Sequence, residues 1–268
     1  MTVIKSRGWS DVMGSRLLRF TVAPLILGVA VLVAASFSTG FYLVLPGQVF
    51  DARKLISLRE QDHAAIHQST QEGAGQILVT TVATGRLRAI DLAFAHLLRD
   101  PGVVREEDLL GPSLSLDLFL QSAHSALIES RSLAEHAVEG FLGLEGDREL
   151  ILRFQSTGFF GSSGGLALAL EITNSLTPGL DLTGGQPVAV TGSVSPQGIV
   201  GRVGGVPQKL DAARRAGAKV FILPLANLPD VGDYSEGPMR LIAVSSLAEA
   251  VRALAGEGWP IPALEGTR

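Results

Sequence analysis

A long uncharged stretch near the N-terminus is the feature that most constrains the fold. No charged residue occurs between Phe20 and Phe50, and the part from Pro24 to Leu45 consists almost entirely of Ala, Val, Leu, Ile, Phe and Gly. At about 1.5 Å per residue, a helix over this part is about 33 Å long, which exceeds the bilayer core of about 30 Å. We therefore expect a transmembrane helix, a signal anchor, over residues 20–45.

The charges on either side of this stretch suggest its orientation. The preceding residues are mostly basic, with Lys5, Arg7, Arg16 and Arg19 opposed by Asp11, whereas the residues after Phe50 have mixed charges. The positive-inside rule then places a basic tail, residues 1–19, in the cytoplasm and the rest of a single-pass chain outside the cell membrane. Two alternatives are a signal peptide cleaved near Ala34-Ala35-Ser36, which also exports the rest of the chain, and a buried helix of a soluble protein.

The composition of the chain excludes several function classes. Hydrophobic residues make up 46% and charged residues 18%, which favours a folded core. The net charge of -4 gives no broad positive field, so nucleic acid is not an expected partner. No cysteine is present, so disulfides, thiolate metal sites and a cysteine nucleophile are excluded. His63 and His67 are four residues apart but lack the Glu of the metalloprotease motif, so we expect neither metal nor cofactor.

Hydrophobic periodicity divides the remaining chain into two regions of α/β (α+β) character. Residues 46–143 form a mixed region, and residues 144–268 alternate short strands with helices in a single domain. The pattern predicts strands at 76–83, 150–154, 188–194, 219–224 and 241–244, and helices at 86–99, 115–142, 166–176, 207–216 and 247–255.

A Gly-Ser run from Gly158 to Gly165 leads directly into the predicted helix Leu166–Leu176. Such a run is also typical of a flexible connection. At the start of a helix, however, unpaired backbone N–H groups stabilise an oxyanion, and Ser162 and Ser163 are placed to act as a nucleophile there.

A serine nucleophile needs a base, and the sequence favours a lysine. All five histidines precede residue 140, and no local motif links them to the serines, although a Ser-His-Asp triad meets in space rather than in sequence. Lysine occurs only at Lys5, Lys54, Lys209 and Lys219. Lys209 is in the first turn of its helix, where the helix dipole and an apolar environment lower the pKa of the amine. The alternative is an ordinary exposed lysine.

The stretch from Gly161 to Pro224 resembles the proteolytic domain of the Lon-type serine proteases, peptidase family S16, which use a Ser-Lys dyad. Gly161-Ser162-Ser163-Gly164-Gly165 is similar to the family's Gly-Pro-Ser-Ala-Gly, with Ser162 in place of Pro and Gly164 in place of Ala. The resemblance implies that Ser163 is the nucleophile, and that backbone groups at Gly161, Ser162 and Gly164 bind the substrate or its oxyanion.

The segment beginning at Lys209 resembles the family's Lys-x-x-Ala-Ala-x-x-Ala-Gly pattern and implies that Lys209 is the catalytic base. Thr191-Gly192 is similar to the family's Thr-Gly, which implies that Thr191 orients the lysine. Other segments look like the membrane-anchored, ATPase-free bacterial branch, which usually carries a PDZ domain: Tyr42 to Gly47, Leu176 to Gly179 and Asp181 to Gly185. The spacing between Gly143 and Phe154 is too short for a PDZ domain, and these 268 residues contain no P-loop motif.

These features together predict a Lon proteolytic-domain-like fold, preceded by a transmembrane helix and a mixed region. The expected function is a membrane-anchored, ATP-independent serine endopeptidase that acts on extracytoplasmic polypeptides. Because relatives assemble as rings, the resemblance also implies a homo-oligomer as one option. Two alternatives remain open: a catalytically inactive binding or scaffold protein of the same fold, and an amidase or esterase that uses the dyad on small substrates.

Overall fold

The computed structural model describes residues 22, 24–33, 35–57, 75–98, 102–110, 116–144, 153–154, 161–177, 179–232 and 237–256. Its chain divides into two compact units. Unit 1 comprises residues 1–43 and 84–111, and unit 2 comprises residues 44–83 and 112–268.

Unit 2 is built around a mostly parallel sheet with the strand order β10-β9-β6-β3-β1. β3 is parallel to β6, β6 to β9, and β9 to β10. The strands are β1 (Ser38–Asp51), β3 (Ile77–Arg88), β6 (Val188–Val190), β9 (Val220–Pro224) and β10 (Arg240–Val244), and the first two also extend into unit 1. Two small antiparallel pairs accompany the sheet: β2 (Ile56–Ser57) with β5 (Arg153–Phe154), and β7 (Ser193–Val194) with β8 (Val200–Gly201).

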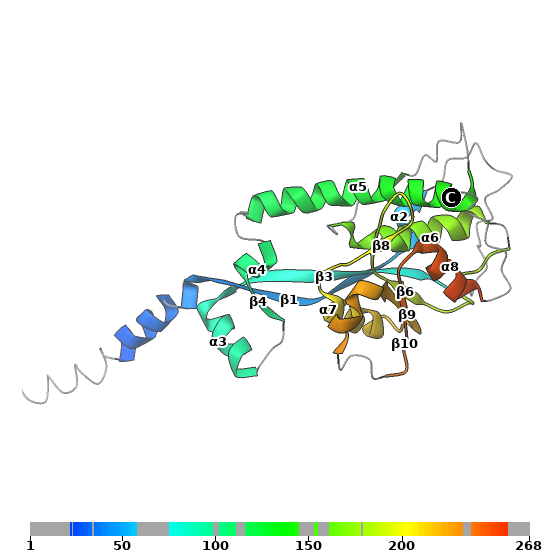
Figure 1. Cartoon of the computed structure of the whole chain (residues 1–268). Helices are drawn as coiled ribbons and strands as arrows, with labels where there is room; N and C mark the ends of the chain where they lie inside the picture. Colours follow the sequence, from blue (N-terminus) through cyan, green and yellow to red (C-terminus); the bar gives the residue numbers. More distant parts are fainter. Residues whose placement is uncertain are drawn as a thin grey trace, which may run out of the picture. The chain divides into compact units, whose positions relative to one another are not determined.

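Helices cover both faces of this sheet. The main helices are α5 (Leu116–Leu142), α6 (Gly165–Leu176), α7 (Val206–Arg215) and α8 (Leu247–Ala255), with the short elements α2 (Ala52–Leu55), η2 (Ser162–Gly164) and η3 (Leu225–Asp230). Figure 1 shows α5 and α6 on one side of the sheet and α7 on the other. Alternate residues of β6 separate the two layers, because Val188 and Val190 pack in the core with α5, α6 and α8, whereas Ala189 packs with α7.

The long helix α5 belongs to the same core as α6. Its residues Leu127, Ala134, Val138 and Phe141 are buried in one cluster with the α6 residues around Leu166. This helix, which the sequence predicts at 115–142, therefore packs against α6, the helix that follows the Gly-Ser run.

Besides the N-terminal part of β1, the C-terminal part of β3 and the helical residues 24–33, the described part of unit 1 contains one strand and two helices. They are β4 (Val103–Arg105), α3 (Ala89–Leu98) and α4 (Glu106–Leu110). β4 pairs antiparallel with β1, and Thr39 Oγ1 donates a 2.6 Å hydrogen bond to Leu87 O. Residues 24–33 are also helical.

The predicted transmembrane helix over residues 20–45 is wrong in its second half. The described helical residues end at Ser36, and β1 begins at Ser38. Tyr42 and Val44 are buried while Leu45 is exposed, an alternation that fits a strand rather than a helix. The strand forms because β4 and β3 pair with it, and this pairing satisfies its backbone groups. Among the described residues, no helix has the length and apolar character needed to cross a bilayer.

The predicted α/β class is confirmed, and most predicted elements occur with shifted ends. The strand predicted at 76–83 extends to Arg88 as β3, which shortens the helix predicted at 86–99 to Ala89–Leu98. The strand predicted at 188–194 is interrupted after Val190 and resumes as β7. Of the strand predicted at 150–154, the described residues are the two of β5.

Candidate active site

Thr191 lies at the carboxyl end of β6, between the two parallel neighbours of that strand. Its side chain is fully buried, and its backbone N–H donates a 3.0 Å hydrogen bond to Ile222 O of β9. Ligands of open α/β sheets bind at the carboxyl ends of parallel strands, where loops from both layers meet. Thr191 therefore marks the edge of the sheet at which a site is expected.

Ser163 is attached to this edge by backbone hydrogen bonds. It belongs to the turn η2, which leads into α6. Gly192 N–H donates a 2.8 Å hydrogen bond to Ser163 O, and Leu166 N–H donates a 3.0 Å bond to Gly192 O. These reciprocal bonds fix the start of α6 against the residue that follows Thr191.

Gly192 makes this close approach possible. Its φ of 153° is in the region that favours glycine, and an added Cβ would lie 3.2 Å from both Leu166 Cδ2 and Val200 Cγ1. A side chain at this position would push α6 away from β6. The glycine that follows Thr191 therefore has a packing role in placing Ser163.

Lys209 approaches from the other face of the sheet, on the first turns of α7. The N-cap residue Gly205 has φ 69°, and Lys209 N–H donates a 3.0 Å hydrogen bond to Gly205 O. The Lys209 side chain is only 3% exposed. Its Nζ donates a 3.1 Å hydrogen bond to Thr191 Oγ1.

The Thr191 hydroxyl connects the two sides of the site. It accepts the bond from Lys209 Nζ and donates a 3.4 Å bond to Ser163 O. The structure thus brings Ser163, Thr191 and Lys209 together. Among the hydrogen bonds between described residues, none joins Ser163 Oγ directly to Lys209 Nζ.

The environment of Lys209 favours its neutral form. Burial lowers the pKa of Lys209 from 10.5 to about 8, because removal from water penalises the ammonium ion. Within the described ranges, no carboxylate forms an ion pair with Lys209 that would restore the pKa. An amine with this pKa has a sizeable neutral fraction near neutral pH and can accept a proton.

The other predicted site residues surround Ser163 but differ in availability. Gly161 N–H donates a 3.0 Å hydrogen bond to Ala123 O of α5, so this amide is engaged in the structure. Gly165 N–H donates to Ser162 O and closes the η2 turn. Gly164 is buried at the N-cap of α6, where backbone N–H groups point out of the helix start. Since the amides of Gly165 and Leu166 are engaged as well, the oxyanion role fits the amide of Gly164 better than that of Gly161.

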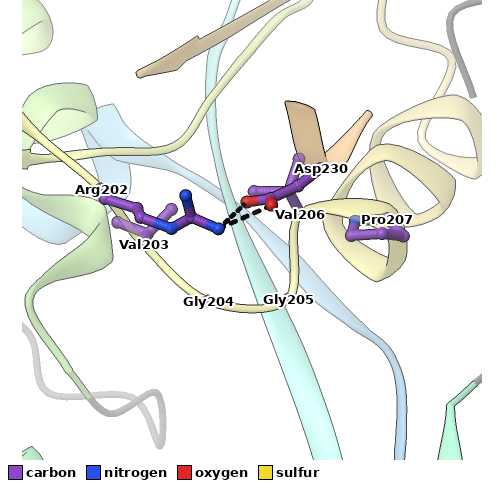
Figure 2. Close-up of a pocket in the computed structure, with 7 residues that line it drawn as sticks. All are labelled: Arg202, Val203, Gly204, Gly205, Val206, Pro207 and Asp230. Carbon is purple, nitrogen blue, oxygen red and sulfur yellow. Dashed lines mark hydrogen bonds and ion pairs between the residues drawn. The ribbon is translucent and has the colours of Figure 1, made fainter. Parts of the chain in front are cut away.

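An open pocket of about 660 Å³ borders the start of α7, the helix that carries Lys209. Figure 2 shows Arg202 and Asp230 pointing toward each other at this pocket, next to the Gly204–Gly205 loop that enters α7. Arg202 Nη2 donates to both carboxylate oxygens of Asp230, at 2.6 Å from Oδ1 and 2.9 Å from Oδ2, and Nη1 donates a 3.0 Å bond to Ala226 O. The pair ties the loop before α7 to η3.

A buried asparagine, which the sequence reasoning did not identify, reinforces this connection. Asn227 is fully buried; its Oδ1 accepts a 2.9 Å hydrogen bond from Val203 N, and its Nδ2 donates 2.8 Å to Val203 O. Nδ2 also donates 2.6 Å to Asp230 Oδ2. The backbone that leads into the Lys209 helix is therefore fixed by an amide side chain. Its sequence signal is weak, a single polar residue inside Leu225–Asp230.

A second unpredicted polar residue is buried in the helix that follows Ser163. Glu171 is 1% exposed, and its Oε1 lies 3.6 Å from Arg53 Nε. Ser175 Oγ donates a 3.3 Å hydrogen bond to the same Oε1, while Oε2 is buried without a hydrogen-bond partner among the described residues. Burial raises the pKa of Glu171 to about 7.

The histidines are the remaining candidates. His63 and His67 lie outside the described residues, and within those residues no group of three or more His, Cys, Asp or Glu side chains is arranged to hold a metal ion. His136 Nδ1 lies 2.7 Å from Ser132 O, within its own helix α5.

Comparison with known proteins supports a serine-type peptidase domain around this site. Residues 157–255 match the Lon protease (S16) C-terminal proteolytic domain, which confirms the predicted resemblance to the Lon-type enzymes over this segment.

Curated relatives agree with this match. The chain is 36% identical over 103 residues to the archaeal Lon protease of Archaeoglobus fulgidus, covering 38% of this chain and 16% of that protein. It is 32% identical over 138 residues to the archaeal Lon protease of Halobacterium salinarum (47% and 20%), and 30% identical over 167 residues to the Lon protease of Phenylobacterium zucineum (61% and 20%). The matched part of the chain corresponds to no more than a fifth of the length of these relatives.

Proposed function

We propose that this chain is an ATP-independent serine endopeptidase in which Ser163 is the nucleophile, Lys209 the general base and Thr191 the residue that orients the lysine. One observation carries the proposal: a lysine that is 3% exposed donates to Thr191, whose hydroxyl also reaches the Ser163 carbonyl. The absence of a P-loop motif from these 268 residues supports the ATP-independent part.

The proposed reaction follows from the positions of these groups. The reaction requires Ser163 Oγ to come within hydrogen-bond distance of Lys209 Nζ, which takes the hydroxyl proton as Oγ bonds to the scissile carbonyl carbon. The backbone N–H of Gly164, at the N-cap of α6, holds the oxyanion. The Lys209 ammonium ion then protonates the amine as the scissile C–N bond breaks. A water molecule next attacks the acyl carbon while Lys209 takes its proton, and Lys209 returns this proton to Ser163 Oγ as the bond between Oγ and the acyl carbon breaks.

The membrane attachment and extracytoplasmic location also remain proposals. They are supported by the basic residues before Phe20 and by the exposed apolar side chains of the helical residues 24–33. Substrates would be loosely folded polypeptides, because these 268 residues contain no P-loop motif that would bind ATP for unfolding.

The test is cleavage of casein and of a short fluorogenic peptide by the full chain in detergent micelles. Ser163→Ala and Lys209→Met are each expected to abolish cleavage. Ser132→Ala and Lys219→Met are the matched controls, because both replace exposed side chains, and they should retain activity. For the active chain, kcat/KM should rise about tenfold per pH unit below pH 8 and level off above it.

Other outcomes identify the alternatives. Hydrolysis of small esters or amides without casein cleavage, lost in Ser163→Ala, would indicate an esterase or amidase. No hydrolysis of any substrate by a folded chain would indicate a binding or scaffold protein. Activity that is independent of pH from about 6 to 10 would contradict the lysine base.

A further inference from the structure

Helix α3 of unit 1 has an unusually exposed apolar face. Ile90, Phe94, Leu97 and Leu98 are 43%, 60%, 76% and 75% exposed. They occupy positions i, i+4, i+7 and i+8, which form one stripe along a helix. The buried residue of α3 is the small Ala95, which lies outside this stripe. The helix thus buries Ala95 and half-buries Leu92, and it leaves the four large apolar side chains of the stripe exposed.

The helical residues 24–33 in the same unit are exposed in every direction. Leu25, Ile26 and Leu27 are consecutive and are 68%, 63% and 65% exposed. Successive helical residues are about 100° apart, so these three side chains cannot share one face. Val29, Val31, Leu32 and Val33 are also more than half exposed.

These two exposures together define the partner by its chemistry. A protein groove covers one side of a helix, whereas a helix that is apolar all round is matched by an environment that is apolar all round. No charged residue between Phe20 and Phe50 opposes such an environment. α3 differs because it also carries polar residues outside the stripe, Asp91 beside it and His96 away from it, as in helices that lie in the interface of a bilayer.

Both apolar elements belong to one compact unit, so one bilayer accounts for both. We propose that unit 1 is a lipid-docking module in which Ile90, Phe94, Leu97 and Leu98 of α3 enter the interfacial layer of the bilayer that holds residues 24–33. This inference rests on the proposed membrane attachment. It adds a second contact, which would restrain unit 1 at the membrane surface instead of leaving it tethered through one segment.

The absence of cysteine from the chain allows a direct test with single-cysteine variants. The full chain is reconstituted into vesicles of phosphatidylcholine and phosphatidylglycerol and labelled with a bimane fluorophore at Phe94→Cys or Leu97→Cys. His96→Cys is the matched control, because His96 is exposed on the same helix but points away from the stripe. Leu27→Cys reports the attachment itself.

Lipids brominated in the upper acyl chain are expected to quench the labels at positions 94 and 97 at least about twofold more than the label at 96. Equal quenching at the three positions, or none at any of them, would overturn the inference. Quenching at position 27 alone would overturn the role of α3 but leave the attachment standing. Disulfide cross-linking of Leu97→Cys between two chains without lipid quenching would also overturn it, because the stripe would then cover a second copy.

Casein cleavage by the same preparations separates this inference from the proposed function. Cleavage without quenching at positions 94 and 97 would refute only the docking of α3. Quenching at these positions without cleavage would refute the peptidase proposal and leave the lipid contact intact.

Discussion

Replacing Lys209 by methionine is expected to stabilise the folded protein near neutral pH while it removes activity. Methionine has a similar length but no charge, so Lys209→Met keeps the packing of a side chain that is 3% exposed and removes the buried ammonium ion. The hydrogen bond to Thr191 is lost, but Thr191 satisfies only one of the three N–H donors of the ammonium ion, so this loss is small. The desolvation penalty should therefore dominate the change.

The size and pH dependence of this effect follow from the pKa. Because the pKa of Lys209 falls from 10.5 to about 8, the folded state binds fewer protons than the unfolded state between these pH values. The free energy of unfolding of the wild-type chain therefore gains a contribution that increases with pH across this window. The penalty amounts to about 3 kcal/mol at and below pH 8 and to about 1 kcal/mol at pH 10.

Urea unfolding of both proteins at pH 7, 8, 9 and 10 measures this difference. The titration of all other groups contributes equally to both proteins and cancels in the comparison. The excess free energy of unfolding of Lys209→Met over wild type should therefore decrease by about 2 kcal/mol between pH 8 and pH 10. Lys219→Met, at an exposed lysine, should change the free energy of unfolding by less than about 0.5 kcal/mol. A difference between Lys209→Met and wild type that does not vary with pH would refute the claim that burial lowers the pKa of this amine.

Three further substitutions test the groups around Lys209 and Ser163. Thr191→Val removes the hydrogen-bond acceptor of the Lys209 ammonium ion. It should lower kcat/KM about tenfold to a hundredfold and move the increase of kcat/KM with pH to lower pH. Thr191→Ser should retain most of the activity in the same pH–rate measurement. The raised pKa of Glu171 makes the wild-type fold lose stability as pH rises from 5 to 8. In urea unfolding, the free energy of unfolding of Glu171→Gln should therefore increase relative to wild type by about 2 kcal/mol over this range. Equal pH dependence of the two proteins would contradict this. Asn227→Ala should cost about 2–4 kcal/mol and lower kcat, since it leaves the Val203 backbone unpaired; a chain of unchanged stability in urea would show that the amide does not hold the loop before α7.

The residues of the candidate site could be picked out from the sequence because their signals are local. Ser163 follows glycines at a helix start, Thr191 ends a short apolar strand, and Lys209 is in the first turn of a helix. Each residue type has a physical reason to occupy such a position. The structure adds the non-local fact that the carboxyl end of β6 brings the three together.

The N-terminal region shows why the rest could not be predicted in the same way. Phe41 to Val44 is an apolar run of aromatic and branched residues, which periodicity alone cannot assign to helix or strand. The outcome depends on pairing with Val103 to Arg105, about sixty residues later in the chain. Glu171 and Asn227 escaped notice for a related reason, since the burial of a polar side chain is set by tertiary packing.

The hydrogen bond between Thr191 and Lys209 affects both the position of the lysine side chain and the pKa of its amine. A hydrogen bond accepted from an ammonium ion raises its pKa, while burial lowers it. Among the described residues, Thr191 is the hydrogen-bond acceptor of Lys209, and the net shift is downward, to about 8. A carboxylate in place of this hydroxyl would form a buried ion pair and keep the amine protonated. A neutral hydroxyl at the end of β6 holds the amine near Ser163 without stabilising its charge enough to prevent it from acting as a base.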